Sequence, residues 1–356
     1  MRKLATIAVI EKLEPIPNAD KILKATVRGW ECVVSKSDMF NVGDKVIFIE
    51  VDSVLPPRPE FAFMKDRKYR VRTIKLRKQI SQGLVLPMSY LKGHFEIGDD
   101  VTKLLGITKY DPQADAEKKL LKESAGGRPW VRWFMRFRWF RKIWGFFKVQ
   151  NLAFPTNICS KTDEERVQNL PKKFTEWFSA KVPFTVTEKL DGCSATYFMD
   201  GKTFGVCSRN IWLRKEDGSP YWEIAKRFDL KGCLCKLQKT FNVERVVIQG
   251  EIIGKAIQGN KYHISGYDYF VYNIIVDGVK FSQQLQSYWC KELGLNTVPV
   301  LETAYQLPPT IHEAVEYAKG KSRLLDIERE GLVIRNYDED ISFKIINPEF
   351  LLKNNE

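Results

Sequence analysis

The chain has 356 residues, of which 44% are hydrophobic and 28% are charged, which excludes a disordered polymer and is enough for packed cores. A chain of this length favours two domains. Its net charge of +13 attracts nucleic acids, nucleotides or an acidic membrane surface, and charge alone does not choose among these.

The cysteine and histidine residues do not have the spacing of a zinc site, because the seven cysteines are scattered and the chain has three histidines. Reduced thiols predict an intracellular protein, cytoplasmic or nuclear. The N-terminus is not a signal peptide, since Glu11, Lys12 and Glu14 interrupt its apolar stretch. The most hydrophobic window, Trp130–Lys148, carries too many basic residues for a transmembrane segment.

Residues 1–110 alternate short β-like runs with turn signals. These runs are ATIAVIEKL, ILKATVRG, WECVVSK, DKVIFIEVDSVLP, YRVRTIKL and GLVLPMSYL. Short strands at this spacing predict an all-β barrel of the five-stranded OB type.

A basic stretch from Lys65 to Lys78 crosses the predicted barrel. Arg70, Arg72 and Lys78 lie there among β-branched residues, with Tyr69 available for stacking. Barrels of this type hold nucleic-acid strands in charged grooves, so these three basic residues are candidate RNA-binding residues. The alternative is an ordinary solvated face of a strand.

The composition shifts between residues 111 and 150, which we interpret as a linker or insertion. Its block Trp130–Lys148 has nine aromatic and six basic residues. One interpretation packs the block between the two domains. The others are stacking on RNA bases and docking to a partner or to an acidic membrane surface.

Residues 151–356 mix β-like runs with helical stretches, which predicts an α+β domain with antiparallel sheets. The predicted strands are FTVTEKL, ATYFMD, TFGVCSR, VVIQGEIIG, YFVYNIIV, GLVIR and ISFKII, and the predicted helices are WEIAKRF and TIHEAVEYAKGK.

The first candidate catalytic group is Lys189, which stands at the end of an apolar strand before the turn Asp191-Gly192. A partly desolvated lysine has a depressed pKa and supplies the neutral amine that nucleophilic attack requires. A Lys-x-Asp-Gly sequence taken alone is more typical of a surface turn. The segments that follow it decide between these readings.

Further groups suited to nucleotide chemistry follow in order on short β-like segments. They include a guanidinium, two carboxylates, two aromatic rings spaced to share one face of a strand, and a second lysine. These residues are Arg209, Glu251, Phe270, Tyr272, Glu330 and Lys344. Each has a structural alternative as a core residue or a solvated strand end, but their joint order favours one nucleotide site.

The order KLDG, SRN, QGE, YFVYN, EGLV, SFK resembles the motifs of the covalent nucleotidyltransferase superfamily, which comprises ATP-dependent DNA and RNA ligases and mRNA capping enzymes. The longer strings KTDEERVQNLP, TEKLDGCSATYF and QGEIIGKAIQGNKY resemble RNA ligases in particular. A barrel placed before the catalytic domain resembles the RNA ligase clade with an N-terminal OB domain.

This resemblance implies an ATP-dependent RNA ligase, working as a monomer in RNA repair, that joins a 3′-hydroxyl to a 5′-phosphate through lysyl-AMP and RNA-adenylate. Lys189 would be the nucleophile, and Lys344 a catalytic residue that grips the α-phosphate. The implied nucleotide-binding residues are Glu188, Lys189, Arg209, Glu251, Phe270 or Tyr272, Glu330 and Lys344. Asp191, Glu251 and Glu330 would hold a hydrated Mg²⁺ or Mn²⁺.

The last motif departs from the family pattern, because Ile346 occupies the place of a second lysine and Lys353 is too distant to replace it. Three alternatives remain open: a DNA ligase, a capping-type guanylyltransferase, and a catalytically silent RNA-binding protein. The first two normally place an OB domain after the catalytic domain, and here twelve residues follow Lys344. The intact set of lysines and carboxylates argues against the silent protein.

Overall fold

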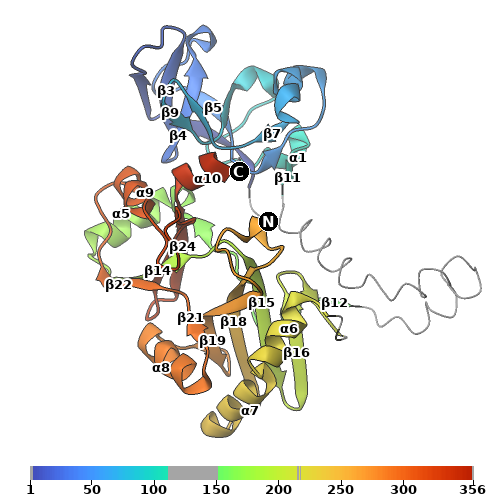
Figure 1. The fold of residues 1–356 in the computed structure, drawn as a ribbon. Helices are drawn as coiled ribbons and strands as arrows, with labels where there is room; N and C mark the ends of the chain where they lie inside the picture. Colours follow the sequence, from blue (N-terminus) through green and yellow to red (C-terminus); the bar gives the residue numbers. More distant parts are fainter. Residues whose placement is uncertain (1–2, 111–150, 215, 217, 355–356) are drawn as a thin grey trace, which may run out of the picture.

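The computed structural model describes residues 3–110, 151–214, 216 and 218–354. The first range forms a barrel of short strands, drawn in blue in Figure 1, and the rest forms a larger domain below it. The aromatic and basic block Trp130–Lys148 lies outside the described residues.

The barrel region contains short antiparallel strands and one short helix. The strands are β1 (Ala5–Val9), β2 (Lys12–Pro15), β3 (Ile22–Val27), β4 (Trp30–Ser35), β5 (Lys45–Ile49), β6 (Ser53–Val54), β7 (Arg70–Val71), β8 (Ile74–Leu76), β9 (Gln79–Ser81), β10 (Leu84–Pro87) and β11 (Thr108–Lys109), and the helix is α1 (Thr102–Leu105). Their sheet orders are β1-β5-β10, β2-β3-β4, β11-β6-β7 and β8-β9.

Strand β5 is apolar on both faces because it separates two hydrophobic clusters. Ile47 and Ile49 pack into one cluster, and Val46 and Phe48 pack into the other. Successive side chains of a strand point to opposite faces, so one apolar run serves both cores. The barrel region therefore has two hydrophobic clusters, one on each face of the sheet β1-β5-β10.

The larger domain is built on two sheets. The eight-stranded sheet has the order β12-β17-β16-β15-β18-β19-β20, with β21 also paired to β19, and the five-stranded sheet has the order β13-β24-β23-β14-β22. Their strands are β12 (Leu152–Ala153), β13 (Glu165–Arg166), β14 (Phe184–Lys189), β15 (Cys193–Asp200), β16 (Thr203–Ser208), β17 (Ile211–Trp212), β18 (Arg245–Gly254), β19 (Tyr267–Val276), β20 (Val279–Lys280), β21 (Asn296–Thr297), β22 (Val300–Tyr305), β23 (Gly331–Asn336) and β24 (Ile341–Ile346).

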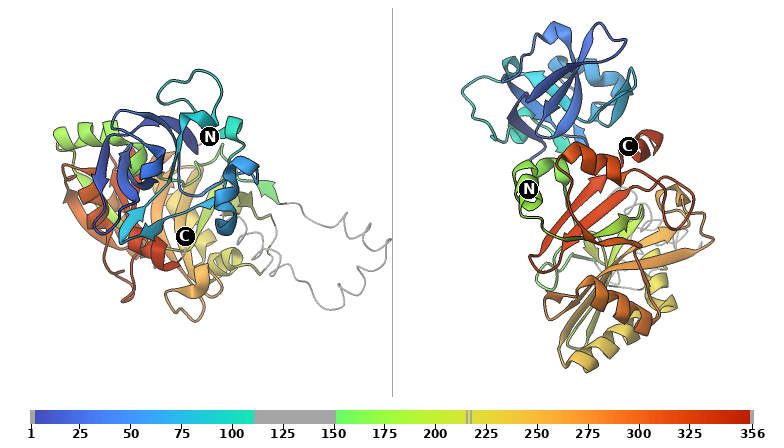
Figure 2. Two further views of the ribbon diagram at one scale, coloured as in Figure 1. Left: turned by 90° about the horizontal axis from the view of Figure 1, so that it is seen from above. Right: turned by 90° about the vertical axis from the view of Figure 1, so that its left-hand side faces the viewer.

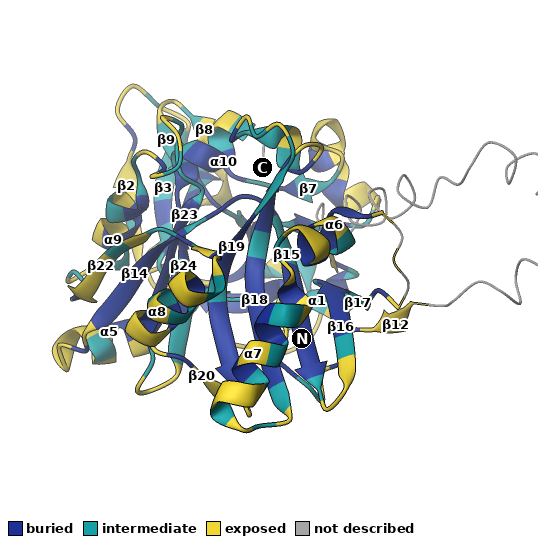
Figure 3. Cartoon of the chain, turned by 60° about the horizontal axis from the view of Figure 1, so that its bottom comes forward, coloured by how far each residue is buried: buried dark blue, intermediate teal, exposed yellow. Residues whose placement is uncertain are grey.

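Helices cover one face of each sheet. Residues of α6 (Pro220–Arg227), α7 (Leu230–Phe241) and α8 (Gln283–Leu293) share a core with the larger sheet. Residues of α5 (Pro171–Ser179) and α9 (Ile311–Ala318) share a core with the smaller sheet. Figure 3 shows the buried strands inside and the exposed helix faces outside.

The predicted α+β class with antiparallel sheets is confirmed, and the predicted strands and helices coincide with observed elements. Two pairings are parallel instead, β13 with β24 and β19 with β21. Each adds a two-residue strand to the edge of an antiparallel ladder, so neither pairing disturbs the main sheets. None of the helices in the described ranges is long and apolar enough to span a membrane.

Polar contacts from one short segment, η4 (Val167–Asn169) and the residue before it, join the domain to the barrel. The Trp30 indole donates to Asn169 Oδ1 over 3.1 Å, and the Asn169 amide donates to Glu50 over 3.2 Å. Arg166 pairs with Asp52 over 3.1 Å. Trp30 and Glu50 are buried, so these contacts fix the barrel above the smaller sheet (Figure 2).

The final helix, α10 (Pro348–Asn354), lies between the barrel and the larger domain, where it is drawn in red in Figure 1. Its Glu349 lies 3.7 Å from Lys75 of β8. Its Phe350 and Leu351 pack against Ile346 at the end of β24. The helix therefore contacts both domains beside the end of β24.

Candidate active site

A cavity of about 370 Å³ opens where the barrel faces the ends of the two sheets. Both domains line it. The lining residues include Asp52, Arg70, Lys109 and Tyr110 from the barrel and Asp163, Arg166, Glu188, Lys189, Asp191, Arg209, Glu251, Tyr272, Glu330, Lys344 and Ile346 from the larger domain.

Lys189 ends strand β14 inside this cavity, as its predicted role requires. Its Nζ donates to Glu330 Oε2 over 2.7 Å. Burial favours the neutral amine, but the charges of Glu330 and Glu251 outweigh burial and raise the pKa of Lys189. The expected depressed pKa is therefore wrong for the protein alone, which holds Lys189 as an ammonium ion.

Glycines let the catalytic strands approach one another closely. A Cβ atom on Gly192 would lie 2.3 Å from the carbonyl oxygen of Ile252, and one on Gly331 would lie 2.3 Å from that of Ile345. Real contacts of this kind are much longer, so larger residues would push β15 from β18 and β23 from β24. The glycines after Asp191 and Glu330 therefore place these carboxylates beside Lys189.

Asp191 and Glu251 complete a group of three carboxylates around Lys189. Asp191 is buried and pairs with Lys261 over 2.5 Å, and its backbone N–H donates to the Tyr262 hydroxyl over 3.1 Å. Burial raises the pKa of Glu251 to about 8 against the opposing charge of Lys189, and the charges of Glu330 and Asp191 add to this rise. Glu251 therefore retains its proton to a higher pH than an exposed carboxyl group does.

The donor set suits a hydrated divalent cation. Within the described part of the chain, no three acidic, histidine or cysteine side chains are grouped closely enough to hold a metal ion directly. Oxygen donors are those that Mg²⁺ prefers, and Mg²⁺ usually keeps several of its waters. Asp191, Glu251 and Glu330 fit the predicted outer-sphere role, because all three carboxyl groups line the cavity beside Lys189.

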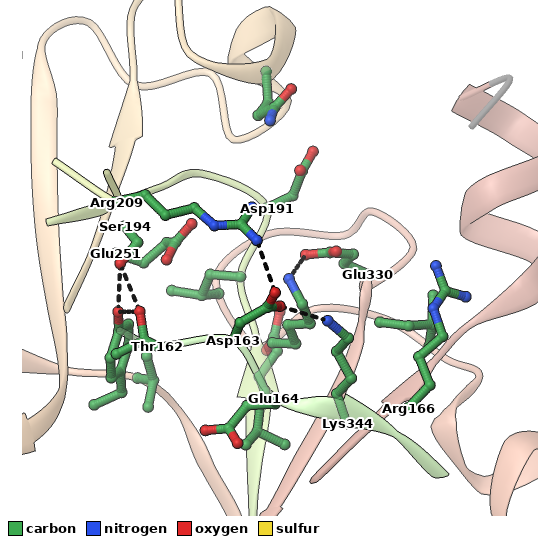
Figure 4. A pocket seen from close by; sticks show the side chains of 18 of the residues that line it. Thr162, Asp163, Glu164, Arg166, Asp191, Ser194, Arg209, Glu251, Glu330 and Lys344 are labelled. Atoms are coloured by element: carbon green, nitrogen blue, oxygen red, sulfur yellow. Dashed lines mark hydrogen bonds and ion pairs between the residues drawn. The ribbon is translucent and has the colours of Figure 1, made fainter. Parts of the chain in front are cut away.

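Asp163 lies among three cations at the cavity wall, and Figure 4 shows its contacts with two of them, Arg209 and Lys344. Its carboxylate lies 3.1 Å from the Arg209 guanidinium, 3.4 Å from Lys344 Nζ and 3.7 Å from Lys109 Nζ. Arg209 and Lys344, both predicted from the sequence, line one cavity, whereas Asp163 was not predicted. Asp163 could have been predicted from its position in KTDEERVQNLP, because that string resembles RNA ligases.

Of the two predicted aromatic residues, Tyr272 lines the cavity and Phe270 does not. Phe270 is buried against Leu190 and Val298. The Tyr272 hydroxyl is hydrogen-bonded to Ser194 over 2.7 Å and to Thr162 over 3.0 Å. These bonds fix the position of the Tyr272 ring at the cavity wall.

Glu188 precedes Lys189 on β14 and is also among the residues that line the cavity. Its side chain is 1% exposed, and its Oε2 accepts a hydrogen bond from the Arg323 backbone N–H over 2.8 Å. Burial raises the pKa of Glu188, and hydrogen bonds from the Arg323 backbone and the Ser322 side chain oppose this rise. The Glu188 side chain is therefore held by the segment around Arg323.

The three predicted RNA-binding residues of the barrel do not share one location. Arg70 lines the cavity, where it pairs with Asp52 over 3.6 Å and covers the Tyr110 ring at 3.7 Å. Lys78 is exposed in the turn between β8 and β9, and Arg72 lies between these two positions in the chain. Lys109 and Tyr110 were missed because no motif marks them.

Ile346 lines the cavity two residues after Lys344, on the same face of β24. Its side chain is 4% exposed and packs against Phe350 and Leu351. Lys353 lies in a separate hollow beside Lys75. Ile346, which replaces the second lysine of the family pattern, thus forms part of the apolar contact that holds α10.

Comparisons with known proteins agree with this geometry. Residues 4–88 match an OB-fold domain model, and residues 182–346 match the model of the RNA ligase family. An RNA ligase of Naegleria gruberi, solved without ligand as a variant, is 32% identical over 98% of this chain and 97% of its own, with a TM-score of 0.79.

Other structures of that ligase hold ligands. One with pyrophosphate is 32% identical over 99% of this chain and 98% of its own, with a TM-score of 0.79. A variant with ATP and Mn is 31% identical over 99% of this chain and 100% of its own, with a TM-score of 0.80. No curated protein sequence matches the chain significantly.

Proposed function

The chain belongs to the RNA ligase family, and from that premise we propose that it joins RNA 3′-hydroxyl and 5′-phosphate ends at the expense of ATP, through an adenylate on Lys189. The observation that carries the proposal is Lys189 at 2.7 Å from Glu330, in a cavity that Arg209 and Lys344 also line. The ATP, AMP and Mn held by structures of the Naegleria ligase support the choice of cofactors.

In the first step, Lys189 Nζ attacks the α-phosphate of ATP. A nitrogen–phosphorus bond forms, the bond between the α-phosphate and its bridging oxygen to the β-phosphate breaks, and pyrophosphate leaves. Lys344 and Arg209 offset the charge of the phosphates. The ammonium ion must first lose a proton, so its contact with Glu330 has to weaken when substrate binds.

A divalent Mg²⁺ or Mn²⁺ near Asp191, Glu251 and Glu330 would supply positive charge for the phosphate and would favour the neutral form of the lysine. The residues of the chain have a separate task. The carboxylates orient the Lys189 amine, and the Tyr272 ring orients the base.

In the second step, the RNA 5′-phosphate takes AMP from Lys189, which breaks the nitrogen–phosphorus bond and forms a phosphoanhydride. In the third step, the RNA 3′-hydroxyl attacks the 5′-phosphate, a phosphodiester forms and AMP leaves. Arg209 is suited to hold the 5′-phosphate because its fork of N–H donors matches phosphate oxygens. The hydroxyl proton leaves with solvent or a nearby carboxylate.

We infer that the nucleotide is ATP and not GTP, because structures of the Naegleria ligase hold ATP.

The broader role that we infer is RNA repair by a monomer inside the cell, in the cytoplasm or the nucleus. All seven cysteines are free thiols, which supports a reducing compartment. Docking through Trp130–Lys148 is part of the same proposal, with RNA as its preferred ligand.

The test is to incubate the protein with α-labelled ATP or GTP and Mn²⁺, and then to offer nicked RNA or nicked DNA. We expect label on the protein from ATP and joining of RNA. Label from GTP would instead indicate a capping enzyme, and preferred joining of DNA would indicate a DNA ligase. A folded protein that takes no label would be a silent binder, which contradicts the proposal.

A further inference from the structure

Asp163 gathers three cations from three separate parts of the chain. Arg209 follows β16, Lys344 belongs to β24 and Lys109 belongs to β11 of the barrel. All three cations lie within 3.7 Å of the Asp163 carboxylate, which points into the cavity in Figure 4. Lys344 and Arg209 are also the residues to which the proposed function gives the phosphate groups.

A carboxylate and a phosphate make the same demands on such cations. Both accept forked hydrogen bonds from a guanidinium and close contacts from ammonium groups. Burial opposes ionisation of Asp163, but the charges of Lys344, Arg209 and Lys109 outweigh burial and lower its pKa to about 2. Asp163 is therefore an anion at neutral pH, and it would repel a phosphate placed beside it.

The segment around Asp163 lets its side chain move while the backbone stays. The Thr162 hydroxyl is hydrogen-bonded to Ser194 over 2.9 Å, and Glu164 pairs with Arg335 over 3.2 Å. Asp163 lies between these two anchors, outside any strand, with its side chain 50% exposed. A rotation of this side chain is therefore enough to release the cations.

We propose that Asp163 is an internal competitor of the substrate phosphates, which holds Arg209, Lys344 and Lys109 when the cavity contains no phosphate and gives them up when ATP binds. This inference rests on the proposed function. Asp163 lowers the affinity of the cavity for ATP and for pyrophosphate alike. Its return to the cations favours the departure of pyrophosphate after Lys189 takes AMP.

The test measures binding of pyrophosphate by titration calorimetry, at one ionic strength and with no divalent ion. We expect Asp163→Asn to bind pyrophosphate about tenfold more tightly than the wild type, which equals about 1.4 kcal/mol. Asp163→Glu keeps the competing charge and should stay near the wild type. Asp340→Asn removes an exposed carboxylate paired with Lys280 outside the cavity, and it should also stay near the wild type.

Weaker or unchanged binding in Asp163→Asn would overturn the inference, and weaker binding would show that Asp163 positions the cations for phosphate instead. Adenylylation separates this result from the proposed function. We expect Asp163→Asn to lower the KM for ATP without raising kcat. Wild-type protein that takes AMP while Asp163→Asn leaves pyrophosphate binding unchanged would refute the inference alone, whereas wild-type protein that takes no AMP would refute the proposed function.

Discussion

Two unlike walls face each other across the cavity. On one side, Lys189 and Glu251 stand on long strands that have hydrogen-bonded neighbours on both edges, β14 between β22 and β23 and β18 between β15 and β19. On the other side, Arg70 and Lys109 stand on barrel strands of two residues each.

The difference separates two tasks. A paired ladder fixes the position of a reacting group to within the tolerance that catalysis requires. Short strands hold side chains mainly through charge contacts, such as those of Arg70 with Asp52 and of Lys109 with Asp163. The side with Lys189 and Glu251, here called the sheet wall, is therefore suited to the chemistry. The side with Arg70 and Lys109, here called the barrel wall, is suited to contacts that change as substrates replace one another.

Replacing the reactive group on the sheet wall should have the largest effect. Lys189→Arg keeps the positive charge beside Glu330, but a guanidinium stays protonated and is not a nucleophile. We expect adenylylation to fall by roughly a thousandfold or more. The measurement is transfer of label from ATP to protein, with circular dichroism to verify folding. Persistent labelling of the variant would show that another residue carries AMP.

Breaking the close contact between strands should be the next largest effect. Gly192→Ala forces a methyl group against the Ile252 carbonyl, and overpacking of this kind costs about 1–3 kcal/mol. We expect lower stability in chemical denaturation and loss of adenylylation, because Asp191 moves with the turn. Gly266→Ala is the matched control, since a Cβ atom there meets nothing within 4 Å. Equal stability of the two variants would contradict the role of close approach.

Basic residues of the barrel should affect different substrates, Arg70 the binding of ATP and Lys78 the binding of RNA. We expect Arg70→Ala to raise the KM for ATP by about tenfold, because it removes a cation from the cavity wall. Lys78→Ala should leave that KM unchanged and weaken RNA binding, with a salt dependence smaller by about one unit in slope. The measurements are adenylylation kinetics and RNA binding across a salt series. A raised KM for ATP in Lys78→Ala, or weaker RNA binding with an unchanged KM for ATP in Arg70→Ala, would contradict this assignment.

The smallest effect concerns the charge on the sheet wall. The folded pKa of Glu251, about 8, lies above its ordinary value of 4.5, so its stabilising effect is complete below pH 4.5 and is lost as pH rises through 8. Glu251→Gln has no carboxyl group at this position, so it does not lose this stability as pH rises. We expect the Tm difference between variant and wild type to be about 5 °C more positive at pH 9 than at pH 6. A difference that is independent of pH would contradict the raised pKa.

The sequence predicted the sheet wall well because its groups lie on regular strands with recognisable spacing. Strand periodicity placed Lys189 and Lys344 at strand positions, and motif order brought Glu251 and Glu330 to the same site. The protonation of Lys189 was not predictable, because it depends on the charge of Glu330, which lies 141 residues away in sequence. Phe270 and Tyr272 could not be told apart, since spacing does not show which ring faces a cavity.

The barrel wall was less predictable. A basic stretch suggested Arg70 and Lys78 as one group, but the turn between β8 and β9 carries Lys78 away from the cavity. Lys109 reaches the site through contact between domains, and no local pattern records such a contact. Asp163 was missed for a related reason: its partners, Lys109, Arg209 and Lys344, are distant from it in sequence.

The pairing of β14 also determines when the site is completed during synthesis of the chain. Because synthesis proceeds from the N-terminus, β14 emerges long before its two neighbours, β22 and β23. The barrel strands pair with one another, so all of these pairing partners are made before β14 and the barrel can fold early. Lys189 meets Glu330 only after nearly the whole catalytic domain has been made. A nascent or shortened chain that lacks β23 and β24 therefore presents an unpaired apolar strand edge and no assembled nucleophile.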